Sequence, residues 1–201
     1  MKAREAIAAY QQVLNIESDN DEAYNATIYL CRAIRDEEAA NFWLMRRAND
    51  PQVAATKRAQ AYTLMASREW NCSYVITEKK ENKVTVTWRN RQLLLYRKPE
   101  DQRDFNTAKQ CAGRGLELIE QAINLDAESE QAWSYKTNLL IELVKLAEMQ
   151  GDHQLKVDYQ ERGSEAQLRT AELTEKEKRR REDDEKKKVE SMMNQSLPSQ
   201  Q

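Results

Sequence analysis

The sequence repeats a helical pattern after 34 residues, and this repeat restricts the folds that the chain can adopt. The pattern Ala6-x3-Tyr10 returns as Ala40-x3-Leu44, a shift of 34 residues, and a looser copy is Gly115-x3-Ile119. A second helical pattern alternates with the first, beginning at Ala23-Tyr24, Ala61-Tyr62 and Ala132-Trp133. Helix–turn–helix units at this period stack into an α-solenoid. A solenoid presents a surface to partners, so the pattern predicts binding rather than catalysis.

Composition favours helices and sets limits on the partners. The 201 residues include only 4 Gly and 3 Pro, too few for a turn-rich β architecture. The net charge of −2 gives no general attraction to nucleic acid, so we expect no nucleic-acid partner. No apolar run approaches the ~20 residues that span a bilayer, so we expect no membrane insertion.

Apolar periodicity and turn signals predict seven helices. They are expected at about residues 2–16, 21–34, 36–48, 53–72, 99–125, 130–149 and from 152 onward. Residues 1–174 form the predicted repeat domain, and residues 175–201 form a charged helical to disordered tail. Between 175 and 190, fifteen of sixteen residues are charged, eight basic and seven acidic, so the tail can pair its own charges along a helix.

One segment interrupts the repeat. Tyr62 and Trp133 are 71 residues apart where one repeat would give 34, an excess of 37 residues. Within the excess, 84–88 alternates apolar and polar β-formers, 89–92 resembles a turn, and 93–96 can form a second strand. We predict a β-hairpin in an insert at about 73–99; the alternative is that 93–96 is helical or an unstructured loop. A lone hairpin is marginally stable in water, so its apolar face should pack on the helices or on a partner.

These patterns resemble the tetratricopeptide repeat family. Tyr24, Tyr62 and Trp133 match the large aromatic early in the first helix of a repeat. The small residue of the second helix is matched by Ala6, Ala40 and Gly115, and its bulky residue by Tyr10, Leu44 and Ile119. Pro51 matches the proline that follows the second helix. The resemblance covers about residues 2–165, with degenerate units.

The resemblance implies a protein-interaction scaffold that binds a peptide or partner domain in a concave groove. First helices would line this groove with the following residues: Asn25, Tyr29, Arg32, Thr63, Ser67, Trp70, Ser134, Asn138 and Glu142. The alternative function is a structural or assembly component that makes contacts through its ends and the hairpin. Exposed side chains at Tyr10 and on the hairpin would favour this alternative, whereas a buried hairpin beside a deep groove would favour the scaffold.

The sequence lacks the patterns that indicate catalysis. His153 is the only histidine, so no zinc site is expected. Gly113-Arg114-Gly115 is not preceded by the strand that a dinucleotide-binding loop requires. We therefore expect neither enzymatic activity nor a cofactor.

Two cysteines flank the insert. Cys72 and Cys111 lie on the two helices that the insert joins, and they can form a disulfide if their Cβ atoms come within about 4.5 Å. Such a bond would imply an oxidising compartment. The alternative is two free, half-buried thiols. Cys31 falls on an apolar helical face, as expected for a small core residue.

The first helix resembles the second half of a repeat unit whose first helix is missing. Its apolar stripe is formed by Ala6, Tyr10, Val13 and Leu14, and one side of it has no partner in this sequence. We therefore expect either a portion of a longer protein or self-association through this helix. The sequence as given shows no signal peptide, so the default expectation is a cytoplasmic location. If a signal lies upstream, the cell envelope is the alternative.

Overall fold

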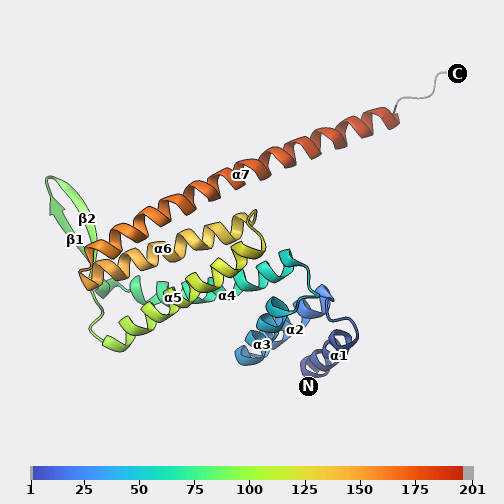
Figure 1. Ribbon diagram of the computed structural model, residues 1–201, viewed down its shortest axis with the longest axis horizontal. Coiled ribbons are helices and arrows are strands. Elements are labelled where there is room, and N and C mark those ends of the chain that lie inside the picture. The colour runs from blue at the N-terminus through green and yellow to red at the C-terminus, as the bar shows by residue number, and fades with distance from the viewer. Residues whose placement is uncertain (1, 197–201) are drawn as a thin grey trace.

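A computed structural model describes residues 2–196 of the chain as seven α-helices and one β-hairpin (Figure 1). The helices are α1 (Lys2–Ile16), α2 (Asp21–Ala33), α3 (Glu37–Asn49), α4 (Ala55–Thr77), α5 (Gln102–Leu125), α6 (Glu130–Gln150) and α7 (His153–Ser196). A short 3-10 turn, η1 (Lys80–Asn82), leads into strands β1 (Lys83–Trp88) and β2 (Arg91–Tyr96). The predictions of a mostly helical chain with seven helices and an inserted hairpin are confirmed for these residues.

Local signals in the sequence set most helix ends. The side chain of Asn20 accepts a hydrogen bond from the Ala23 amide at 2.9 Å, and Asp36 and Ser129 cap α3 and α6 in the same way. These side chains satisfy amide groups that have no acceptor within the first turn. Gly151 ends α6 in the left-handed region, with φ of 74°, which costs little without a Cβ atom.

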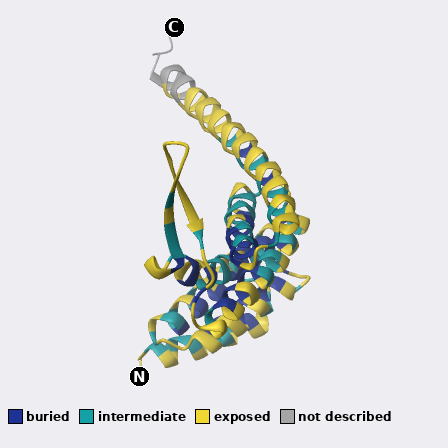
Figure 2. Cartoon of the chain, turned by 90° about the vertical axis from the view of Figure 1, so that its left-hand side faces the viewer, coloured by how far each residue is buried: buried dark blue, intermediate teal, exposed yellow. Residues whose placement is uncertain are grey.

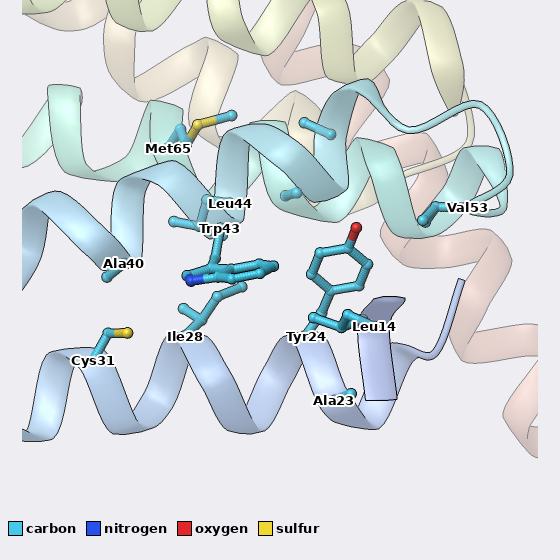
Figure 3. Close-up of a cluster of buried hydrophobic side chains, with 12 residues drawn as sticks. Leu14, Ala23, Tyr24, Ile28, Cys31, Ala40, Trp43, Leu44, Val53 and Met65 are labelled. Atoms are coloured by element: carbon cyan, nitrogen blue, oxygen red, sulfur yellow. The ribbon is translucent and has the colours of Figure 1, made fainter. Parts of the chain in front are cut away.

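Consecutive helices pack side by side along the chain, and α4 also contacts α6. Around Tyr24 of α2 and Trp43 of α3, one apolar cluster joins α1 to α4; the two rings meet edge to face, 6.3 Å apart (Figure 3). Two further clusters, which include Leu139 and Leu140 of α6, join α4 to the later helices. The core is therefore a chain of local clusters that follows the order of the helices.

α4 is longer than its sequence pattern predicts. It continues past Cys72 to Thr77, so the insert begins near residue 78 rather than 73. The last turns of α4 bury Ser73, Ile76 and Thr77. Tertiary burial therefore extends a helix that contains β-branched residues of modest helix propensity.

α7 leaves the body of the molecule. Leu173 is the last buried side chain of α7 in the stretch up to residue 188, and residues 174–188 are almost entirely exposed (Figure 2). Ion pairs such as Arg179–Glu175 and Arg181–Glu177 run along this part of the helix. The predicted helical tail is thus present up to Ser196, and the predicted disordered end at 197–201 lies outside the described residues. No helix within 2–196 combines the length and apolarity needed to cross a bilayer.

Candidate interaction surfaces

The nine residues predicted to line a groove lie on α2, α4 and α6 but differ in exposure. Seven are at least partly exposed: Asn25, Tyr29, Arg32, Ser67, Trp70, Ser134 and Asn138. Tyr29 is 71% exposed, whereas Trp70 packs against Tyr74 and Tyr135 with ring centroids 5.1 and 6.0 Å away. Four cavities formed by described residues are all lined in part by α7, and none of the nine residues lines them.

The structure corrects two of these nine assignments. Thr63 is 2% exposed, and its hydroxyl donates to the backbone oxygen of Ala59 at 2.9 Å. Glu142 is 1% exposed and lies within a polar cluster between α4 and α6. Both side chains point into the helical packing, because the turn of each helix places them on the side that faces its neighbour. Neither residue is available to a ligand in an open groove.

A buried ion-pair cluster surrounds Glu142. Its carboxylate accepts hydrogen bonds from the hydroxyls of Thr77 at 2.6 Å and Ser73 at 3.2 Å. Lys145 Nζ donates to Glu142 at 2.6 Å and to Glu78 at 2.7 Å, so one ammonium group bridges two carboxylates. A buried charge is tolerated when it is paired and hydrogen-bonded in this way. This role of Glu142 and Lys145 was not predicted from the sequence, although a lysine within the apolar run 143–147 of α6 was a signal for it.

The cluster keeps the carboxylate of Glu78 ionised. Burial alone would raise the pKa of Glu78, but hydrogen bonds from Lys145, Lys83 and Tyr96 outweigh it and lower the pKa to about 2. For Lys145, burial favours a lower pKa, and the hydrogen bonds to Glu142 and Glu78 raise the pKa above its ordinary value. Glu78 therefore carries no exchangeable proton near neutral pH. The arrangement is suited to fixing α4 against α6 rather than to acid–base chemistry.

The same cluster anchors the base of the hairpin. The Tyr96 hydroxyl donates to Glu78 at 3.0 Å, and the Tyr96 amide donates to Glu148 of α6 at 2.8 Å. Lys156 of α7 binds the other oxygen of Glu148 at 2.6 Å. A cavity of about 530 Å³ opens beside these groups, between α6, α7 and Tyr96. The angle at which the hairpin leaves the body is therefore set by buried and half-buried polar contacts.

Beyond its base, the hairpin projects away from the helices (Figures 1 and 2). Its two-residue turn is Arg89-Asn90, with φ of 46° and 59°, as in a type I′ turn. The predicted four-residue turn 89–92 is therefore wrong, because Arg91 and Gln92 already pair with β1. The apolar face was expected to pack on the helices or on a partner; Trp88, at 62% exposed, does not pack on the helices, and packing on a partner stays a prediction.

The strand register separates the hairpin into two faces. Val84 lies opposite Leu95, Val86 opposite Leu93, and Trp88 opposite Arg91. Residues directly opposite each other point to the same side of an antiparallel sheet. We call the resulting surface the apolar hairpin face; it consists of Val84, Val86, Trp88, Leu93 and Leu95. Leu93 is 42% and Leu95 40% exposed, whereas Val84 and Val86 are half-buried. The tip and the β2 side of this face are therefore open to solvent.

The N-terminal helices form a second exposed apolar region. Leu14 of α1 is fully buried, and Val13 packs partly against the first cluster. Tyr10 is 38% and Ile16 85% exposed on the same helix. The predicted stripe is therefore split, with Leu14 in the core and Tyr10 exposed to solvent.

The two cysteines that flank the insert lie at bonding distance. The Sγ atoms of Cys72 and Cys111 are 2.11 Å apart, and a bond between them crosslinks α4 and α5. Cys31 is a buried free thiol. His153 is exposed at the start of α7, and within the described part of the chain no three His, Cys, Asp or Glu side chains converge as metal ligands.

Comparison of the chain with protein-family models, with curated proteins and with solved structures returned no match.

Proposed function

We propose that this protein is an assembly component that binds a partner protein, with the hairpin as its main contact. The exposed apolar hairpin face is the observation that carries the proposal. An isolated two-stranded hairpin has little stability of its own in water, and exposed side chains such as Trp88 gain nothing from remaining there. A partner that covers this face would remove apolar surface from water at about 25 cal/mol per Å².

The rigid base supports the same proposal. Tyr96 is held by Glu78 and Glu148, so the hairpin is presented at a fixed angle. Fixing a binding element in advance lowers the entropy lost on association. Polar contacts that position an otherwise exposed apolar element are expected of an interaction site.

The helical body is proposed to be a tetratricopeptide-like solenoid that carries the hairpin. Consecutive packing of α1 to α6, with the additional contact between α4 and α6, is the arrangement expected for stacked helix pairs. The hairpin replaces the short turn between α4 and α5. In this proposal the helical repeats position the hairpin, and the hairpin binds the partner.

Affinity capture with matched variants tests the proposal. The whole chain is used as bait in a lysate of cells that produce it. The hairpin variant carries Val86→Thr, Trp88→Ser and Leu93→Thr, and the matched groove variant carries Tyr29→Ala, Trp70→Ala and Asn138→Ala. We expect the hairpin variant to lose a specific partner that the groove variant retains, with both variants keeping the helical circular dichroism of the parent. Loss from the groove variant alone would contradict the proposal.

A peptide bound on the first helices is the second candidate, and Arg32 favours it. The Nε and Nη2 atoms of Arg32 are buried without a hydrogen-bond partner among the described residues. Burial, and then the nearby charge of Arg68, lower the pKa of Arg32. An acidic group of a bound peptide would supply the missing acceptor. The groove variant of the capture experiment distinguishes this candidate from the first.

A further inference from the structure

The hairpin segment has a charge opposite to that of the rest of the chain. Residues 79–98 contain seven basic side chains and one acidic one, a net charge of +6, whereas the whole chain carries −2. The remaining residues therefore sum to −8. Lys79 and Lys83 are paired with Asp104 and Glu78. In the described part of the chain, Lys80, Arg89 and Arg91 have no acidic side chain within ion-pair distance.

The positive charge borders the apolar hairpin face. Arg91 lies on the same side of the sheet as Trp88, and the Arg89 guanidinium stacks 5.6 Å from the Trp88 ring. A complementary surface would combine apolar side chains with carboxylates or another anionic group. A second copy of this hairpin is disfavoured as the occupant, because it would bring two segments of charge +6 together.

The free edge of β1 specifies how such a partner can bind. The backbone amide of Arg97 donates to the backbone oxygen of Asn82 at 3.0 Å. This bond fixes which residue pairs of the antiparallel ladder are hydrogen-bonded to each other and which are not. From this alternation, the amide and carbonyl groups of Lys83, Thr85 and Thr87 point away from β2. On the opposite edge, the Tyr96 amide is already bound by Glu148. β2 makes the larger contact of the hairpin with α6, so the edge of β2 is partly occupied at its base.

We propose that β1 binds an extended acidic segment of a partner protein as a third strand, whose alternate apolar side chains extend the apolar hairpin face. Main-chain hydrogen bonds to residues 83–87 provide affinity, and side chains provide specificity, as in other cases of strand addition. An anionic lipid surface is less favoured, because hydrocarbon would leave the polar groups of this edge unsatisfied. This inference rests on the proposed function and adds the binding mode and the chemistry of the partner.

Peptide binding to the whole, oxidised chain tests the proposal. The probe is a blocked, fluorescently labelled peptide of alternating glutamate and valine, about seven residues long to match a strand. The control is the same peptide with lysine in place of glutamate. We expect the acidic peptide to bind saturably, with an affinity that falls as salt is added. The lysine peptide should bind with an affinity at least about tenfold lower. Amide exchange at Thr85 and Thr87 should slow on binding.

Two proline variants separate edge pairing from general attraction. Thr85→Pro removes an amide that faces the open edge of β1, and Leu94→Pro removes the equivalent amide on β2. Proline is tolerated at an edge position whose amide faces solvent, so both hairpins should remain folded. We expect Thr85→Pro to lower the affinity of the chain for the acidic peptide at least about tenfold. Leu94→Pro should change this affinity less than about twofold.

Several outcomes would overturn the inference. These are no binding of the acidic peptide, equal binding of the lysine peptide, or no difference between the two proline variants. Binding of the chain to vesicles of phosphatidylserine and phosphatidylcholine, without binding of the peptide, would assign the face to lipid. Loss of the captured partner in the hairpin variant but not in Thr85→Pro would retain the proposed function and reject strand addition. Retention of that partner in both variants would reject the proposed function as well.

Discussion

Alanine substitutions at two helical glycines should change stability in opposite directions, although the glycines are two residues apart on α5. A Cβ atom at Gly113 would meet no atom within 4 Å, whereas one at Gly115 would lie 2.5 Å from Leu139 Cδ2 and 3.1 Å from Glu69 Cβ. Replacing glycine by alanine in a helix interior stabilises it by about 1 kcal/mol. At Gly113 nothing opposes this gain, so we expect Gly113→Ala to stabilise the protein by about 1 kcal/mol.

At Gly115 the gain is outweighed by overpacking. Leu139 is fully buried in the cluster between α4, α5 and α6, so its methyl group cannot move aside freely, and Glu69 Cβ is held by the backbone of α4. Overpacking of a core typically costs about 1–3 kcal/mol. Gly115→Ala should therefore be less stable than Gly113→Ala by about this amount, which corresponds to about 2–4 °C in the melting temperature for each kcal/mol.

Thermal and denaturant unfolding of the oxidised chain measure the difference. A Leu139→Ala background gives a further control, because it removes the methyl group that a Cβ atom at position 115 would contact. In that background, Gly115→Ala should recover about 1–3 kcal/mol relative to its effect in the parent chain. Equal stability of Gly113→Ala and Gly115→Ala would refute the close approach of α5 to α6.

Four further predictions concern the ion-pair cluster, the disulfide and the N-terminal surface. Lys145→Met should lower the free energy of unfolding by about 3–5 kcal/mol, because it leaves Glu142 buried and unpaired; Lys79→Met, at an exposed pair, should change little in the same denaturant titration. Glu78 has a pKa of about 2 in the folded state, below its ordinary 4.5. Its ionised carboxylate therefore stabilises the fold above pH 4.5, and this stabilisation is lost as the pH falls toward 2. Glu78→Gln should flatten this part of the pH–stability profile, and an unchanged profile would contradict the role of Glu78. Reduction of the Cys72–Cys111 bond, at a sequence separation of 39, should destabilise the protein by about 4 kcal/mol in the chain-entropy model. A reductant should then shift the melting temperature of the parent chain but not of a Cys72→Ser, Cys111→Ser variant. Light scattering should show concentration-dependent association that Tyr10→Glu weakens, and a monomer at high concentration would contradict self-association through α1.

The sequence alone determined the elements whose signals are local. Capping residues such as Asn20 and Asp36 define helix starts, and Gly151 defines the end of α6. The hairpin could be predicted because its period of two residues differs from the helical period on either side. Each of these signals acts within a few residues, so no knowledge of the tertiary structure was needed.

The tertiary structure decided which side chains are buried and what the hairpin contacts. Glu142 and Thr63 were assigned to an open groove by their helix positions, yet the packing of α4 against α6 buries both. The contact between Lys145 and Glu78 joins residues 67 positions apart. Such pairs depend on how helices rotate and approach each other, and an apolar pattern fixes that rotation only within a broad stripe. The exposure of Trp88, Leu93 and Leu95 follows from the same cause, since only the assembled fold shows which part of the hairpin the helices leave exposed.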